Sequence, residues 1–123
     1  MKEIAMVFLG GGAGSIARFA LGRWLNDSVS GIPFGTFAAN VVGSLLIGLI
    51  LGAAAKGDWL NHHTTLLLAT GFCGGFTTFS TFAYENHLFL KNGDLLSFAL
   101  YALGSFVLAF GSVFLGMWLV KYF

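Results

Sequence analysis

The fold is decided by the stretch GFCGGFTTFSTF, which runs from Gly71 to Phe82 inside a long apolar run. It joins a glycine pair to four hydroxyl residues and alternating phenylalanines, a combination with poor propensity for a continuous helix. Backbone that leaves the helix at membrane depth survives only where protein or a polar cavity covers it. Such a break exposes carbonyl and N–H groups that ions can use. We therefore predict a helix broken near residues 74–79; the alternative is a kinked helix whose hydroxyls bond back to their own carbonyls.

Four apolar runs include and surround this stretch, at about residues 4–25, 34–55, 64–90 and 95–120. Each is long enough to cross about 30 Å of hydrocarbon at roughly 1.5 Å per residue. The chain is 57% hydrophobic and 9% charged, whereas soluble domains carry about 25% charged residues. We therefore predict an all-α integral membrane protein, with four transmembrane helices in a single domain over residues 1–123. Arg18 and Arg23 in the first run argue against a cleaved signal peptide.

Small residues and aromatic residues mark how these helices pack and where they end. Glycines four residues apart occur at Gly10 and Gly14, Gly48 and Gly52, and Gly71 and Gly75. We interpret them as packing faces, because close backbone approach replaces the hydrophobic drive that helices lack in lipid. The aromatic residues at the predicted helix ends, where such rings favour the headgroup layer, are Trp24, Trp59, Trp118 and Tyr122.

Lysine and arginine are spread evenly over the two sides of the predicted bundle. Four passes put both termini and the middle loop on one side, which carries Lys2, Lys56 and Lys121. The other side carries Arg23 and Lys91, plus Arg18 if it reaches that interface. The positive-inside rule therefore gives almost no preferred orientation. Our hypothesis is that the chain inserts both ways and forms an antiparallel homodimer about an axis in the membrane plane.

Other classes of function find little support in the sequence. No basic run would follow a phosphate backbone, which argues against a nucleic-acid partner. Cys73 is the single cysteine and has no basic partner in its segment, so neither a disulfide nor a nucleophile is indicated. The adjacent His62 and His63 make a poor metal pair. The stretch Gly12–Ala17 fits a dinucleotide pattern but lacks its acidic residue and βαβ order. We predict no enzyme.

Neutral polar side chains form stripes on the second and fourth runs. Thr36, Asn40 and Ser44 share one face of the second run, and Tyr101 and Ser105 share one face of the fourth. With the hydroxyls of the third run, three helices thus contribute neutral donors. Convergent donors without buried acids favour a path for an anion over a proton relay or a cation pore. The alternative for Asn40 is hydrogen bonding between helices, which is common for asparagine in membranes.

Aromatic and charged residues adjoin these stripes. Phe79 and Phe82 lie beside the hydroxyls, and the positive edge of a phenylalanine ring can contact a small anion. The alternative for both is ordinary packing or contact with lipid. Arg18 lies deep in the first run, where it either attracts anions at a vestibule or pairs with a helix C-terminus. Glu85 and the two residues after it mark the end of the third span and a wet vestibule.

Three of these stretches together resemble the Fluc (CrcB) family of fluoride channels. The resemblance rests on Gly71–Phe82, on GGAGSIARF at Gly11–Phe19 and on GTFAANVVGS at Gly35–Ser44, and it extends over all four spans. It implies an antiparallel, dual-topology homodimer with two pores, which exports fluoride passively from a bacterial cytoplasm across the inner membrane. It also implies a structural sodium ion at the centre of the dimer.

The resemblance further assigns roles to individual residues. It implies that Asn40, Phe79 and Phe82 line the pore. The other residues that it places on or near the fluoride pathway are Ser80, Thr81, Tyr101, Ser105 and Thr36, with Arg18 and Glu85 close to the vestibules. Sodium would be held by the backbone carbonyls of Gly74 and Thr77.

The chain departs from the family pattern at two places. Phe76 stands where a smaller aliphatic residue is expected, which should affect packing more than conduction. Ala109 lies one turn after Ser105, so any further hydroxyl in the polar track must come from Ser112.

Two competing functions make different demands on the sequence. A four-pass drug or cation antiporter needs an acidic residue inside its first helix, but Glu3 lies at the very end and the next acid is Asp27. An assembly protein would use its glycines and polar residues only to hold helices together, and it would pass no ions in liposomes. The sequence by itself does not distinguish fluoride from chloride as the permeant ion.

Overall fold

The structure is a computed structural model that describes residues 1–26, 31–57 and 60–122. All regular structure in these ranges is helical. The elements in chain order are α1 (Lys2–Leu25), α2 (Phe34–Ala55), α3 (His62–Thr65), η1 (Leu66–Cys73), α4 (Gly74–Phe76), α5 (Ser80–Lys91) and α6 (Leu95–Val120). Trp59, which we predict at the membrane interface, lies outside the described residues.

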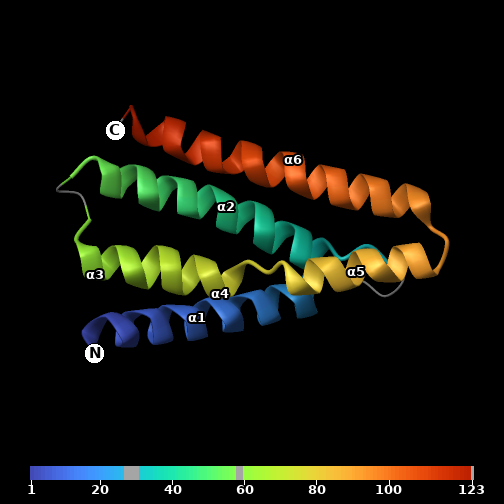
Figure 1. Cartoon of the computed structure of the whole chain (residues 1–123), viewed down its shortest axis with the longest axis horizontal. Helices are drawn as coiled ribbons and strands as arrows, with labels where there is room; N and C mark the ends of the chain where they lie inside the picture. Colours follow the sequence, from blue (N-terminus) through green and yellow to red (C-terminus); the bar gives the residue numbers. More distant parts are fainter. Residues whose placement is uncertain (27–30, 58–59, 123) are drawn as a thin grey trace.

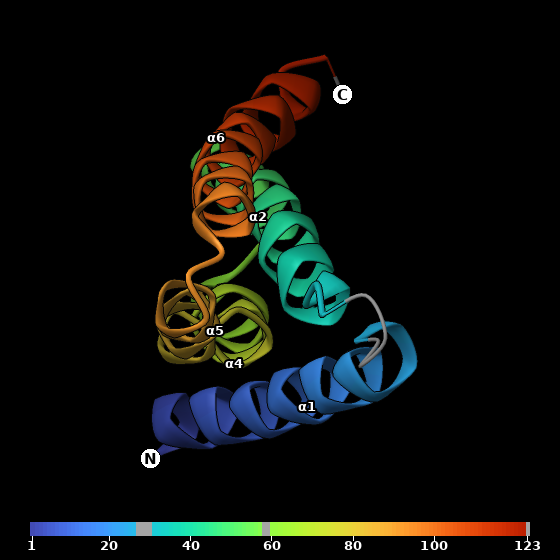
Figure 2. The ribbon, with the colours of Figure 1, turned by 90° about the vertical axis from the view of Figure 1, so that its right-hand side faces the viewer.

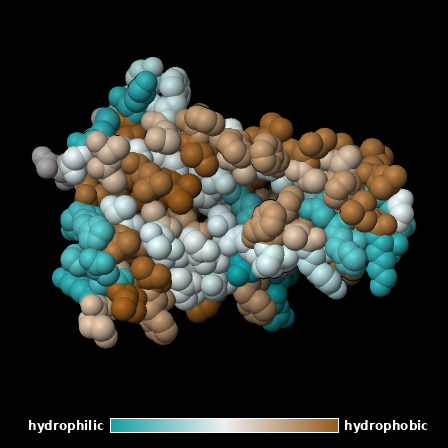
Figure 3. Space-filling model, in the orientation of Figure 1, coloured by the Kyte–Doolittle hydropathy of each residue, from teal (hydrophilic) through white to brown (hydrophobic). Residues whose placement is uncertain are grey.

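Four helices in the described part of the chain are long and apolar enough to cross a membrane, which confirms the predicted all-α membrane class. They are Lys2–Leu25, Phe34–Ala55, the composite His62–Lys91 and Leu95–Val120. In each, no more than 22% of the most apolar window is buried within the chain. The apolar surface therefore faces outward, as it does in a protein whose solvent is lipid. Figure 3 shows this surface in brown, with hydrophilic residues gathered toward the two ends.

The helices run back and forth along one long axis, as Figure 1 shows. Both termini and the connection from α2 to α3 lie at one end of the molecule, and the turn from α5 to α6 lies at the other. The main contacts join α2 to α6 and α1 to η1 and α4. Viewed end-on in Figure 2, α2 and α6 form one pair, and α1 crosses beneath α4 and α5. The third span thus lies between α1 and the α2–α6 pair.

Glycines set how closely α1 approaches the third span. A side-chain carbon on Gly14 would lie 2.8 Å from the backbone nitrogen of Phe76 and closer still to the carbonyl oxygen of Phe72. Both atoms belong to backbone that cannot move aside alone, so only glycine fits at this position. One turn earlier in α1, Gly10 lies equally close to the backbone of the third span. Close backbone contact of this kind is how helices associate in lipid.

Asn and Asp side chains cap the N-termini of two helices. The Asn61 side chain accepts a hydrogen bond from Thr64 N (2.8 Å) at the start of α3. Asp94 accepts one from Ser97 N (3.1 Å) at the start of α6. Hydrogen bonds from the Ser97 hydroxyl and backbone N–H hold the pKa of Asp94 below its ordinary value. Asn26, at the end of α1, accepts from Gly35 N (2.6 Å) and so ties α1 to the first turn of α2.

The third span changes its winding twice before it is interrupted. η1 is a π-helix, α4 is a single α-helical turn, and Thr77 then adopts an extended conformation (φ −90°, ψ 157°). Regular helix resumes at Ser80. The interruption at residues 77–79 falls inside the predicted stretch 74–79, but Gly74 is itself helical (φ −62°, ψ −38°). The break therefore follows the glycine pair, and the hydroxyls of Thr77 and Thr78 there bond to the backbone of Cys73 and Thr81.

Candidate site at the break in the third span

A groove of about 870 Å³ lies beside the break. Its walls come from α2, from the third span on both sides of the break, and from α6. The polar side chains in its lining belong to Asn40, Ser44, Thr70, Thr77, Thr78 and Ser105. Three phenylalanines, Phe79, Phe82 and Phe106, provide the aromatic part of the wall. The groove is therefore an apolar cleft with a few neutral hydrogen-bonding groups, located where the backbone leaves the helix.

Asn40 binds the interrupted backbone with both atoms of its carboxamide. Its Oδ1 accepts a hydrogen bond from Thr78 N (2.8 Å), and its Nδ2 donates to Thr78 O (3.1 Å). Buried backbone groups without partners are costly at membrane depth, so these two bonds stabilise the extended segment. One of the two amide hydrogens remains for another acceptor. Asn40 thus forms hydrogen bonds between helices, and one N–H of its amide is left to donate at the groove.

Ser105 presents a hydroxyl that the described residues leave without a partner. The residue is 5% exposed, and its Oγ makes no hydrogen bond to any described part of the chain. A buried hydroxyl without a partner is unusual, and it indicates a place for a group that the chain itself does not provide. Ser105 lines the groove, as does Ala109 one turn later, whereas Ser112 does not.

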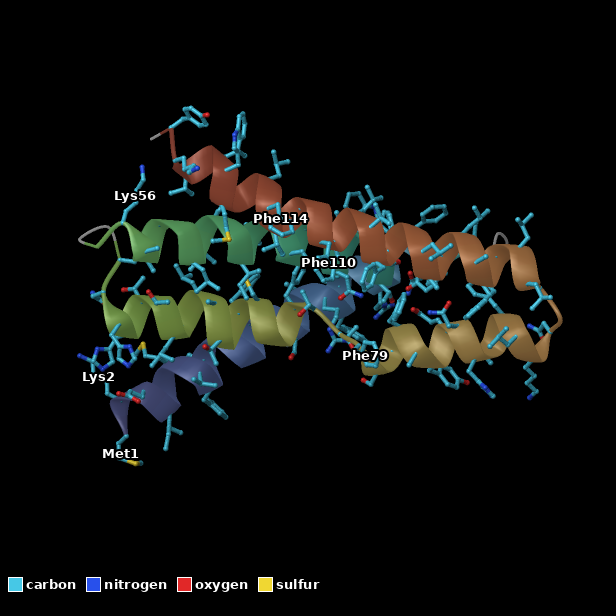
Figure 4. All side chains as sticks on the ribbon, turned by 45° about the horizontal axis from the view of Figure 1, so that its top comes forward. Met1, Lys2, Lys56, Phe79, Phe110 and Phe114 are labelled. Atoms are coloured by element: carbon cyan, nitrogen blue, oxygen red, sulfur yellow. The ribbon has the colours of Figure 1, made fainter. Side chains whose placement is uncertain are left out.

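Aromatic rings connect the groove to the next part of the site. The centroids of Phe79 and Phe82 are 6.1 Å apart, and those of Phe82 and Tyr101 are 5.1 Å apart. Phe79 is 79% exposed, and Figure 4 shows it at the gap between the two halves of the third span. Its ring therefore lies at the surface of the single chain, while Phe82 lies between it and the buried Tyr101.

Glu85 receives hydroxyl hydrogen bonds from two other helices. Tyr101 donates to its Oε1 (2.7 Å) and Thr36 to its Oε2 (2.8 Å). The carboxylate also lines a second pocket of about 400 Å³, together with Asn26 and Asn92. The pocket lies beside the start of α2 and the end of α5. Glu85 thus lies between this pocket, whose lining is mainly apolar, and the aromatic residues that lead to the groove. Its role at a vestibule stays a prediction.

Arg18 lies against the end of α4. Its Nε donates to the carbonyl oxygen of Gly75 (3.1 Å). That carbonyl lies in the last turn before the break, where its helical donor would be the N–H of Phe79. Of the two roles considered for Arg18, the contact favours pairing with a helix C-terminus, where cations are stabilised.

The structure brings together some of the predicted site residues and separates others. Asn40, Phe79, Phe82, Ser105, Gly74 and Thr77 all line the groove. Thr36 and Tyr101 meet at Glu85 instead, one step from the groove. Ser80 and Thr81 belong to the first turn of α5 and are absent from the lining of both pockets. The hydroxyl oxygens of Ser80 and Thr78 lie 3.4 Å apart.

Thr78 is a residue of the candidate site that the sequence did not single out. Its backbone binds Asn40, and its Oγ1 accepts from Thr81 N (3.3 Å) at the start of α5. A signal was present, since a threonine three residues before a helical N–H is the spacing of a helix cap. The stretch holds four hydroxyl residues, however, and the spacing alone does not say which of them caps the helix.

Comparison with known proteins gives a consistent result. The family model described as CrcB-like protein, Camphor Resistance (CrcB), matches residues 5–117. The chain is 52% identical over 123 residues to the Fluoride-specific ion channel FluC of Gloeothece citriformis, covering 98% of both chains. It is 44% identical over 121 residues to the protein of the same name from Chlorobaculum tepidum, covering 98% of this chain and 96% of that relative. Similarity therefore extends over all four spans.

Proposed function

Because the chain belongs to the CrcB family, we propose that it is a fluoride-specific ion channel of a bacterial membrane, through which fluoride leaves the cytoplasm by passive electrodiffusion. The observation that supports this most strongly is the groove at the break in the third span. It combines neutral donors with phenylalanine rings at membrane depth. Neutral donors suit an anion that has lost its water, and the positive edges of the rings suit it equally.

The proposed path runs from the pocket at Glu85 to the groove. Fluoride sheds water in the pocket and passes the ring of Phe82. It then reaches the unpaired hydroxyl of Ser105 and the remaining amide hydrogen of Asn40. The hydroxyls of Thr36 and Tyr101 donate to Glu85 in the structure. Both can rotate toward an anion only by leaving the carboxylate. The donors that are available to fluoride are thus Ser105 and Asn40. We assign Thr36 and Tyr101 to the entrance of the path.

The channel works as a homodimer in this proposal. The groove opens onto the surface of the chain, with Phe79 at 79% and Phe106 at 62% exposure. Irregular backbone does not face lipid, so residues 77–79 need a protein cover. A second copy of the chain supplies this cover. It lies in the opposite orientation, because the even spread of lysine and arginine lets the chain insert either way. Two-fold symmetry then gives two pathways for each dimer.

A structural sodium ion fits the chemistry of the break. The carbonyl oxygens of Gly74 and Thr77 accept no hydrogen bond from any residue that the structure describes. Free carbonyls of unwound membrane helices are typical ligands for sodium. Both residues line the open groove, so two copies together would offer four oxygens. When bound, the ion would supply positive charge and hold the two broken helices together.

Fluoride efflux from liposomes tests the proposal. Purified protein is reconstituted, a fluoride electrode follows the release, and chloride-loaded vesicles serve as the comparison. We expect fast fluoride release, little chloride release, and loss of fluoride release in Phe79→Ile protein that still folds. A protein that only assembles helices would release neither ion. Unchanged release in both Phe79→Ile and Asn40→Asp would remove these residues from the pathway.

A further inference from the structure

Asn40 has a second role in the geometry of the break. We infer that it is a positioning residue for the cation site: by binding Thr78 N, its carboxamide keeps the Gly74 carbonyl free to act as a ligand. The inference rests on the proposed function, because it takes the Gly74 and Thr77 carbonyls as the sodium ligands. It concerns a group on α2 that contacts neither carbonyl directly.

An unbroken helix would give the Gly74 carbonyl a hydrogen-bond donor. In an α-helix the N–H of residue 78 donates to the carbonyl of residue 74, four positions earlier. One residue before, this pattern still holds, because Thr77 N donates to Cys73 O (3.0 Å). At Thr78 the pattern stops, and the N–H donates to Asn40 Oδ1 instead (2.8 Å). The Gly74 carbonyl loses its donor at the very residue that Asn40 binds.

The second carbonyl loses its donor in a parallel way. The helical donor to Thr77 O would be the N–H of Thr81, which donates to Thr78 Oγ1 instead (3.3 Å). Thr78 itself is held in place by Asn40, whose Nδ2 donates to the Thr78 carbonyl (3.1 Å). The same residue that Asn40 fixes therefore accepts from Thr81 N in the first turn of α5 and leaves Thr77 O without that donor. One asparagine controls both oxygens, the first directly and the second through Thr78.

The neighbouring carbonyl shows that this arrangement is selective. Gly75 O, which lies between them in sequence, accepts a hydrogen bond from Arg18 Nε (3.1 Å). That oxygen has a donor on α1, whereas Gly74 and Thr77 line the groove and their oxygens have no donor among the described residues. Since Asn40 also borders the groove, it links the cation site to the proposed anion path through a single side chain.

Sodium-dependent thermal stability tests this role without measuring transport. The melting temperature of the purified protein is followed while sodium chloride is replaced by N-methyl-D-glucamine chloride at constant ionic strength. A bound ion raises the melting temperature by mass action, which yields an apparent sodium affinity. In Asn40→Ala, Thr78 N returns to Gly74 O, and we expect that affinity to fall by about tenfold or more.

The conservative variant separates positioning from general damage. Asn40→Asp keeps an oxygen that accepts from Thr78 N but loses the donor to Thr78 O. We therefore expect a sodium affinity between those of Asn40→Ala and the unsubstituted protein, even though the added charge stops fluoride. Ser112→Ala is the control. It also removes one hydroxyl from a long helix, but it lies outside the groove and should keep the sodium response. If Asn40→Ala does not fold, Thr78→Ala serves in its place, with weaker sodium affinity expected.

Two results would overturn the inference. One is an unchanged sodium affinity in Asn40→Ala, or in Thr78→Ala where that variant replaces it; the other is an equal loss in Asn40→Asp. An unsubstituted protein whose melting temperature ignores sodium would overturn it together with the sodium assignment. Fluoride efflux from the same preparation would then show separately whether the channel proposal stands.

Discussion

At the scale of single residues, the sequence indicates which side chains carry chemistry better than it indicates what they touch. Asn40 and Ser105 are recognisable because amides and hydroxyls are rare and costly inside apolar helices. Their different situations are set by tertiary contacts that no spacing reveals. Asn40 is occupied by Thr78, whereas Ser105 has no partner among the described residues. Glu85 illustrates the same limit, since its two donors lie on other helices.

Replacing Ser105 should reduce transport with little effect on stability. Its hydroxyl makes no hydrogen bond within the described chain, so Ser105→Ala removes no internal bond. If fluoride uses that hydroxyl, efflux from liposomes should fall by about tenfold, the effect of losing one hydrogen bond to a charged group. The melting temperature should stay almost constant. Ser112→Ala, on the same helix but outside the groove, is the control, and equal efflux in both variants would contradict the assignment.

Replacing Tyr101, unlike replacing Ser105, should lower the stability of the fold. Tyr101→Phe keeps the ring against Phe82 but removes the donor to Glu85 Oε1, which leaves a half-buried carboxylate with one partner. We expect a loss of about 1–3 kcal/mol in the free energy of unfolding. Thr36→Val should act similarly, and the double variant should lose less than the sum because both serve one group. Unfolding free energies that do not change in either single variant would exclude this network.

At the scale of the elements, the spans could be predicted and the internal winding of the third could not. Length and hydropathy predict four helices, because a bilayer accepts little else. Thr77 and its neighbours in the sequence predict a break. They do not predict that it starts after the glycine pair, because that position depends on Asn40 from another helix. The π-helix η1 left no signal in the sequence that we could interpret.

Glycine substitutions in α1 test the close packing of this helix on the third span. A side-chain carbon at Gly14 would overlap the backbone of Phe72, whereas one at Gly12 would meet nothing within 4 Å. Gly14→Ala should therefore lower the free energy of unfolding by about 1–3 kcal/mol, through strain and displaced backbone. Gly12→Ala should leave it unchanged or raise it by roughly 0.5–1 kcal/mol. Thermal unfolding in detergent compares the two, and equal stabilities would mean that α1 packs differently.

At the scale of the whole molecule, the single chain leaves the groove beside the break open at its surface, where Phe79 is exposed. Figure 4 shows Lys2 and Lys56 at the same end, as four passes of the chain predict. The sequence could suggest a partner from the even spread of lysine and arginine, and the structure adds a reason for one in the groove that opens beside residues 77–79.

Fixing the orientation of the chain should abolish transport. Extra lysines in the loop between α2 and α3 should hold that loop in the cytoplasm and allow only one topology. An antiparallel dimer then cannot form, and cells should lose fluoride export. Co-expression with a second variant, whose extra lysines lie in the turn between α5 and α6, should restore it. Full activity of either variant alone would contradict the antiparallel arrangement, and a topology reporter confirms that each orientation is fixed.

The central claim is that two copies of this chain form a channel selective for fluoride, and a reversal potential tests it most directly. Purified protein is placed in a planar bilayer with a tenfold fluoride gradient and equal chloride on both sides. We predict a current that reverses near the fluoride equilibrium potential, about 59 mV from zero for a univalent ion. A current that reverses at zero, or no current from protein shown to be folded, would contradict the account.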